Sequence, residues 1–390
     1  MHRLSSRLLI LLLFALPMFA QAPAERAVDL TSADGTKLKG TYFPAAKSGP
    51  GVLLLHQCNK DRKIWDGLAR QLSAAGLNVL TFDLRNFGDS GGKPFAQLTP
   101  QEIGASTRQW PADVDAAFQY LVSQPGVTRD TIGVGGASCG VNNSIQAARR
   151  HPEVKSLVLL AGTSDMEGRK FLRSSPKLPA LFGVADDDEF PATIATIEWL
   201  YSLDPNPGKK FVRYDKGGHG AEIFAVHPEF EGVIKDWFVT TLIKTPGSAP
   251  ASKEKAPISK NAEVLDLLDQ PGGVAKVSQM LADARKKDPK AIVFAEEPVN
   301  ILAYEYMQAG DNKRALEIMK LNAEAFPDSA NVYDSLGDVY LADGQKDLAL
   351  QNSRKALELL PNDKSITDEQ RRAAIKQSAE QKLKQLGAQQ

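Results

Sequence analysis

The chain has 390 residues, which is more than one typical domain needs and is suited to two. Basic residues (Lys and Arg) and acidic residues (Asp and Glu) each number 47, and 43% of all residues are apolar. This balance excludes the strongly basic surface of proteins that bind nucleic acid or anionic membranes, and the composition is that of a globular protein.

The N-terminus has the three parts of a secretory signal peptide. Two arginines precede an apolar run over 8–16, and small residues follow around Ala20 and Ala22. The run is shorter than the roughly 20 residues that span a bilayer, and an uncleaved anchor is the alternative. We therefore expect a signal peptide over 1–22, export to the periplasm or the medium, and no stable membrane insertion after cleavage.

Between residues 51 and 243, short apolar runs alternate with segments of helical spacing. GVLLLHQ (51–57) predicts a strand buried on both faces, and WDGLARQLSAAG (65–76) predicts a helix that ends at a glycine. Further strands are expected within 77–85, 130–138, 154–162, 178–186 and 209–216, and further helices within 110–126, 139–153, 191–203 and 230–243. This order predicts an α/β domain with a mostly parallel sheet and helices on both faces.

A segment rich in Pro, Ala, Ser and Lys (244–260) predicts a linker. Such a segment has few means of holding an intimate interface, so we expect the residues before it to fold and act without those after it. The remainder, 261–390, is expected to be a small all-α domain.

An internal repeat lies within this helical part. Six residues recur 34 positions later: Leu302, Ala303, Tyr306, Gly310, Ala315 and Pro327 correspond to Leu336, Gly337, Tyr340, Gly344, Ala349 and Pro361. The pattern resembles the tetratricopeptide repeat, which has this period, and a generic pair of helical hairpins is the alternative. The resemblance implies a concave helical stack that binds a protein partner.

GASCG, residues 136–140, fits the motif G-x-S-x-G between a predicted strand and a predicted helix. The sharp turn of this motif needs small neighbours and projects the central side chain above the sheet. Cys139 is not central, because Ala137 and Val141 stand where glycines would be required. The motif therefore predicts Ser138 as a nucleophile, with the backbone N–H of Cys139 as one oxyanion donor.

A serine nucleophile needs a base, and the chain has five histidines. His2 lies in the predicted signal peptide, and His151 and His227 each precede a proline. His56 ends a predicted strand and is better suited to shaping the loop that follows. His219 lies in a glycine-rich loop after the last predicted strand, so we predict that it is the base.

The acid of such a triad is expected between the serine and the histidine in the chain. Asp186, Asp187 and Asp188 follow a predicted strand, and Asp165 is a weaker candidate after the preceding strand. The second oxyanion donor is expected in the loop after the strand at 51–57, at Gln57 or Cys58.

Taken in order, these segments resemble the α/β-hydrolase superfamily, particularly its dienelactone hydrolase-like members. The resemblance covers about 30–243 and rests on VLLLHQ, FDLRNFGDSGG, WPADVDAAFQYL, GGASCG, PALFGVADDDEF and GGHG. It implies an α/β-hydrolase fold over 24–243 and a Ser–Asp–His triad that needs no cofactor or metal. The family spacing P-x-L-x(6)-D falls on Asp188, with Asp187 as the alternative acid. Serine replaces the cysteine of true dienelactone hydrolases, so a dienelactone is not the expected substrate.

The chain has two cysteines, Cys58 and Cys139, and export permits a disulfide between them. In the fold that the chain resembles, the two preceding strands are neighbours, which implies that the pair is bridged. Two buried thiols that pack as small apolar groups are the alternative.

These patterns together predict an exported serine hydrolase, carboxylesterase-like, that cleaves a small or medium acyl ester. A protein partner is expected on the helical repeats, and no nucleic acid is expected. Two alternatives remain: an inactive hydrolase-fold protein that serves as a binding scaffold, and a peptidase of the same fold.

Overall fold

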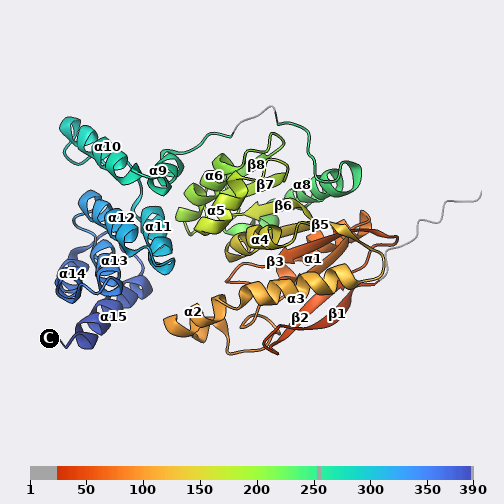
Figure 1. Ribbon diagram of the computed structural model, residues 1–390, viewed down its shortest axis with the longest axis horizontal. Coiled ribbons are helices and arrows are strands. Elements are labelled where there is room, and N and C mark those ends of the chain that lie inside the picture. Colours follow the sequence, from red (N-terminus) through yellow and green to blue (C-terminus); the bar gives the residue numbers. More distant parts are fainter. Residues whose placement is uncertain (1–23, 253–255, 388–390) are drawn as a thin grey trace, which may run out of the picture.

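The computed structural model describes residues 24–252 and 256–387 (Figure 1). The predicted signal peptide lies outside the described residues. Residues 24–244 form a sheet domain and residues 260–387 form a helical domain, and the described residues between them contain no helix or strand. No helix in the described parts of the chain combines the length and the apolar character that crossing a membrane requires.

The sheet domain is built on an eight-stranded sheet with the order β1-β2-β4-β3-β5-β6-β7-β8. Its strands are β1 (Arg26–Thr31), β2 (Lys37–Phe43), β3 (Gly49–Leu55), β4 (Asn78–Phe82), β5 (Val127–Ala137), β6 (Val154–Leu160), β7 (Ala180–Ala185) and β8 (Lys210–Tyr214). Strands β1 and β2 are antiparallel at one edge, and the other six run parallel. The predicted α/β class with a mostly parallel sheet is confirmed.

Helices cover both faces of this sheet, which explains the continuous apolar runs of its strands. In β3, Val52 and Leu54 pack on the side of α1 (Asp66–Ala74) and α8 (Glu229–Phe238). Leu53 and Leu55 join the core on the other face. That face is covered by α3 (Trp110–Ser123), α4 (Cys139–Arg150), α5 (Met166–Arg173) and α6 (Ala192–Leu203).

Two short helices of the sheet domain were not among the predicted elements. Helix α2 (Pro100–Thr107) begins at a capping box, in which Thr99 and Glu102 bond each other's backbone N–H groups. Helix α5 begins at Asp165, whose carboxylate accepts from the backbone N–H of Gly168. The remaining short elements are α7 (Ile223–Val226), a π-helical turn over Val239–Lys244 that extends α8, and three 3-10 turns over Arg62–Trp65, Phe95–Gln97 and Gly220–Glu222.

The helical domain contains two helical hairpins whose bounds repeat with the offset found in the sequence. Helices α11 (Glu296–Gln308) and α12 (Asn312–Ala325) are followed by α13 (Ala330–Ala342) and α14 (Lys346–Leu359), and every bound of the second pair lies 34 residues after its counterpart. Helices α9 (Lys260–Asp269) and α10 (Gly273–Lys287) precede the hairpins, and α15 (Glu369–Gln385) follows them.

The last helix is fixed to the repeats by a buried lysine. Lys382 of α15 is only 4% exposed, and its ammonium group pairs with Asp334 at 2.8 Å and Asp338 at 2.6 Å, both on α13. The hydroxyl of Tyr304 on α11 donates to Asp338 as well. Because a buried ammonium group without partners is costly, this network holds α15 against the two hairpins.

The two domains are in contact, which differs from the loose connection that the linker composition suggests. Helix α9 packs against α6, and α11 also contacts α6 (Figure 1). Trp199 and Leu200 of α6 belong to the same apolar cluster as Leu265 and Leu268 of α9. The contact is made by helices on either side of the linker, and the composition of the linker therefore carries no information about it.

An ion cluster holds this interface together. Arg169 of α5 is 1% exposed and pairs with two carboxylates of the helical domain, Asp269 at 3.0 Å and Glu305. Its guanidinium carbon also lies 4.5 Å from the centre of the Trp199 ring. Arg173 and the indole N–H of Trp199 both donate to Asp266. Separation of the domains would break the contacts that cross the interface and leave Arg169 without its two carboxylate partners.

Burial acts against ionisation of one member of this cluster. It raises the pKa of Glu305 to about 7, although the neighbouring guanidinium of Arg169 favours the charged form. Burial and the neighbouring guanidinium thus act in opposite directions on the ionisation of this carboxyl group.

Candidate active site

Ser138 lies in a sharp turn between β5 and α4. Its backbone has φ 53° and ψ −120°, a region that residues other than glycine rarely adopt. A Cβ added at Gly136 would lie 2.2 Å from the carbonyl oxygen of Gly140, and one added at Gly140 would lie 2.6 Å from that of Leu55. The two glycines of the motif are therefore required by the close approach of backbone segments. The turn leaves Ser138 partly exposed at the carboxyl edge of the sheet.

His219 and Asp188 form a buried pair in the loops after β8 and β7. The Nδ1 atom of His219 lies 2.8 Å from Oδ2 and 3.0 Å from Oδ1 of Asp188. The two residues are only 2% and 4% exposed. The backbone N–H of Phe190 and the hydroxyl of Thr193 also donate to this carboxylate. The carboxylate is thus fixed in place and leaves Nε2 of His219 as the ring nitrogen available for proton transfer.

The other acidic candidates have different contacts. Asp187 accepts from the backbone N–H groups of Gly217 and Gly218, so it supports the loop that carries His219 without touching the ring. Asp186 pairs with Arg213. Asp165 caps α5 and accepts from the side-chain amides of Asn142 and Gln146. Among the four candidates, Asp188 is the one placed on His219.

The side chain of Gln57 ties the histidine loop to the loop that follows β3. Its Oε1 accepts from the backbone N–H of Ala221, and its Nε2 donates to the carbonyl oxygen of His219. A Cβ at Gly220 would lie 2.7 Å from Oε1 of Gln57 and 3.2 Å from Cβ of Ala137, the residue before Ser138. The loop is therefore pressed against the nucleophile turn. Gln57 was predicted only as a backbone oxyanion donor, and no sequence pattern indicates this side-chain contact.

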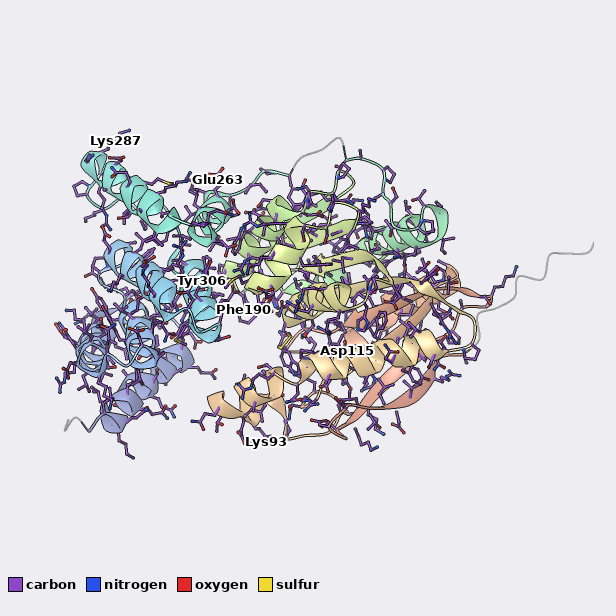
Figure 2. The ribbon with its side chains drawn as sticks, viewed as in Figure 1. Lys93, Asp115, Phe190, Glu263, Lys287 and Tyr306 are labelled. Carbon is purple, nitrogen blue, oxygen red and sulfur yellow. A yellow bond between two sulfur atoms is a disulfide. The ribbon has the colours of Figure 1, made fainter. Side chains whose placement is uncertain are left out.

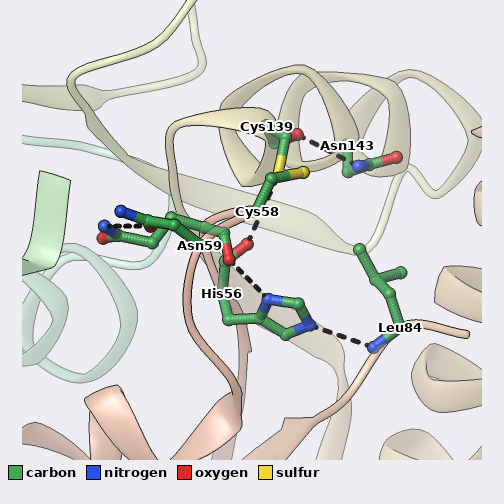
Figure 3. The surroundings of a disulfide bond; sticks show 7 residues. His56, Cys58, Asn59, Leu84, Cys139 and Asn143 are labelled. Carbon is green, nitrogen blue, oxygen red and sulfur yellow. Dashed lines mark hydrogen bonds between the residues drawn. A yellow bond between two sulfur atoms is a disulfide. The ribbon is translucent and has the colours of Figure 1, made fainter. Parts of the chain in front are cut away.

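His56 is buried beneath the same loop and does not face a reactive group. Its Nε2 accepts from the backbone N–H of Leu84, so its Nδ1 carries the proton and donates to the carbonyl oxygen of Gln57 (Figure 3). Burial lowers the pKa of His56, and this favours the neutral ring. His56 thus shapes the loop after β3, as expected from its position.

The two remaining described histidines are occupied elsewhere. His151 bonds Asp115 and stacks on Phe118, and His227 bonds Glu229 and stacks on Tyr214. Neither lies in the loops that carry Ser138 and Asp188.

Cys58 and Cys139 are joined by a disulfide, with their Cα atoms 5.9 Å apart (Figure 3). Cys58 follows β3 through the loop of Gln57, and Cys139 is the first residue of α4, directly after Ser138. The bridge therefore links the two backbone segments from which the oxyanion donors are expected. These are the N–H of Cys139 on one side and that of Gln57 or Cys58 on the other.

We expect the double variant Cys58→Ala, Cys139→Ala to be less stable and slower. The bridge closes a long loop, because its cysteines are 81 residues apart, and losing such a bridge costs about 2–5 kcal/mol. The backbone N–H groups remain, so turnover should fall by less than the roughly hundredfold that follows removal of one oxyanion donor. Thermal melting and steady-state kinetics, with and without reductant, measure both effects. Unchanged turnover in the variant would contradict a role for the bridge in spacing the donors.

A cleft of 1010 Å³ opens beside these loops. Cys58, which is adjacent to Gln57, lines this cleft. Ala221, two residues after His219, lines it as well. Its lining includes three aromatic side chains, Phe87, Phe95 and Phe224, together with polar and charged residues. Within the described residues, no group of three or more His, Cys, Asp or Glu side chains is arranged to hold a metal ion.

Three features are found together in one known fold. They are the strand order of the sheet, the sharp turn at Ser138, and the placement of Asp188 and His219 after successive strands. A family model described as the alpha/beta hydrolase fold matches residues 50–202. The chain has the α/β-hydrolase fold. The predicted α/β-hydrolase fold with a mostly parallel sheet is thereby confirmed, and an all-helical region follows it.

The known proteins to which this chain is similar match it over part of their length. A thiohydrolase of Aspergillus aculeatus is 29% identical over 134 residues, which is 34% of this chain and 39% of that protein. An uncharacterized protein of Mycobacterium tuberculosis is 35% identical over 132 residues, which is 33% of this chain and 43% of that one. The chain thus spans about two fifths of the length of these relatives.

Among solved structures, a dienelactone hydrolase of Anabaena variabilis is similar with 25% identity and a TM-score of 0.45. The alignment covers 57% of this chain and 99% of that one.

Proposed function

We propose that this α/β-hydrolase is an exported serine hydrolase that cleaves an ester or a related acyl bond. The observation that carries the proposal is the buried Asp188–His219 pair, whose loop is held by the side chain of Gln57 and lies against the residue before the strained Ser138. Acyl transfer by serine requires a hydroxyl that is presented on a sharp turn and an imidazole that is held in a fixed orientation.

In the proposed reaction, Nε2 of His219 takes the proton of Ser138 as its Oγ attacks the acyl carbon. Asp188 accepts from Nδ1–H of His219, holds the ring in the correct tautomer and stabilises its charged form. The backbone N–H of Cys139 and that of Gln57 or Cys58 stabilise the oxyanion. His219 then protonates the leaving group, and water releases the acyl group by the same steps in reverse.

For the helical domain we propose a tetratricopeptide-like arrangement, supported by the 34-residue offset between its two hairpins. Binding of a protein partner by this domain stays a prediction. Export likewise stays a prediction, because residues 1–22 carry it.

A covalent probe and a substrate panel test the proposed activity. A fluorophosphonate should add its mass once per chain, on the peptide that contains Ser138. The panel should include carboxylic esters, thioesters and amides of one acyl group, since a similar protein is named a thiohydrolase. We expect ester cleavage at neutral pH. Absence of both labelling and turnover would overturn the proposal, and cleavage of amides alone would favour a peptidase.

A further inference from the structure

A second pocket lies between the two domains, at the start of α6. It has a volume of 290 Å³. Pro191 and Ala192 form its wall on the sheet domain, and the opposite wall includes Glu296, Glu297, Asn331 and Arg371 from the helical domain. Because ligand pockets commonly measure about 300–1,000 Å³, this space is sized for one end of a substrate.

The pocket begins next to a ring that touches the catalytic histidine of the proposed mechanism. Phe190 directly precedes Pro191 and is 47% exposed. Its ring centre lies 4.8 Å from that of His219, in an edge-to-face arrangement. Its backbone N–H donates to Asp188. Figure 2 shows Phe190 on the side of the sheet domain that faces the helical domain. A group bound in the pocket would therefore lie on the histidine side of the site.

The walls of the pocket are fixed relative to each other. Helix α11, which carries Glu296 and Glu297, also carries Glu305, one of the carboxylates that pair with the buried Arg169. Helix α9 adds Asp269 to the same ion cluster and packs against α6. The pocket is thus part of a docked interface.

The chemistry of the lining favours a neutral polar ligand. The carboxylate of Glu297 lies 3.6 Å from the guanidinium of Arg371, and that of Glu296 accepts from the amide of Asn331. The guanidinium is already paired, and the lining carries two carboxylates against this one positive charge, so an anionic ligand would be repelled. The lining presents several hydrogen-bonding groups beside the apolar side chains of Ala295, Pro298 and Ile366. Such a mixed lining suits a ring that carries hydroxyl groups, which has both apolar faces and hydrogen-bonding edges.

The direction of proton transfer decides which half of an ester lies here. His219 gives its proton to the leaving alcohol, so this alcohol must lie on the histidine side. The acyl group would occupy the cleft beside Cys58, on the side of the oxyanion donors. We propose that the interdomain pocket binds the leaving alcohol of the substrate, and that this alcohol is rich in hydroxyl groups, as in a sugar or polyol ester. This proposal rests on the proposed serine hydrolase activity.

Two butyrate esters distinguish binding in the pocket from cleavage of the ester bond. They are 6-O-butyrylglucose and methyl butyrate, which share the acyl group and differ in the alcohol. The full chain should hydrolyse both and should prefer the sugar ester in kcat/KM. Ser365, an exposed residue that lines the pocket, is the site for a filling variant. Ser365→Trp should lower kcat/KM for the sugar ester about tenfold or more and leave methyl butyrate within about twofold.

Ser365→Ala is the matched control, because it loses the same hydrogen bond to Asp363 without filling the pocket, and it should behave as wild type. Rates are normalised to the sites titrated by a fluorophosphonate. If Ser365→Trp yields no titratable sites, Arg371→Met decides, since it removes donors from the same pocket and should also depress only the sugar ester.

The outcomes separate the two proposals. Equal effects on both esters, or wild-type hydrolysis of methyl butyrate without the sugar ester, would overturn the pocket proposal and leave the activity intact. Failure of the wild type to cleave either ester or to react with the phosphonate would overturn the proposed function itself.

Discussion

Ser138→Ala should lower the turnover of any ester substrate by about four to six orders of magnitude, because it removes the proposed nucleophile. The backbone of Ser138 is strained, and alanine keeps a Cβ at the same place, so the fold should be retained. Residual activity from the oxyanion donors and from binding should persist at a low level. Initial rates with a butyrate ester and a fluorophosphonate titration measure both the loss and the missing site.

Ser144→Ala is the control for this variant. Ser144 lies in α4, six residues after Ser138, and its hydroxyl donates to the carbonyl oxygen of Gly140 within the same helix. The same substitution there should leave turnover within a few fold. A Ser138→Ala enzyme that kept more than about a tenth of wild-type turnover would remove Ser138 from the mechanism.

The parts of this protein that the sequence predicted are those set by short-range patterns. The glycines of the motif at 136–140 predicted a sharp turn, and the structure places backbone atoms where any added Cβ would collide. The 34-residue recurrence predicted paired helices with bounds that differ by that number. Each of these features depends on residues close together in the chain, and so the pattern alone could indicate them.

Contacts between residues that are far apart in the chain could not be predicted in the same way. Arg169 meets Asp269 and Glu305, which lie 100 and 136 residues later. The amide of Gln57 reaches the loop of His219 across 162 residues. A surface arginine and a buried docking arginine look alike in sequence, because burial depends on what the rest of the chain places around them.

The docked helical domain changes how the two halves of the chain relate to function. A linker-tethered module would act on a partner at a distance, whereas this domain contacts α6 and shares a pocket with the loop that follows Asp188. Helix α6 begins only four residues after Asp188, so its anchoring by α9 and α11 also supports the acid of the proposed triad. The helical domain is therefore positioned to influence catalysis directly.

Asp188→Asn should lower kcat by about four orders of magnitude, as expected when the acid of such a triad becomes an amide. An asparagine would retain the size of the side chain but only one acceptor oxygen, whereas the N–H of Phe190 and the hydroxyl of Thr193 bond different oxygens of Asp188. It would no longer stabilise the charged ring of His219, and its NH2 group would favour the wrong tautomer. The measurement is kcat for a butyrate ester, with melting temperature as a check on folding.

Asp187→Asn is the matched comparison, one residue away with the same change of charge. Asp187 accepts from two backbone N–H groups of the histidine loop through a single oxygen, and the amide oxygen of asparagine can accept from both. Turnover should therefore fall only a few fold, through small displacements of His219. If Asp187→Asn proved the more damaging variant, the acid would have to be reassigned to Asp187, and the loop after β7 would have to rearrange when substrate binds.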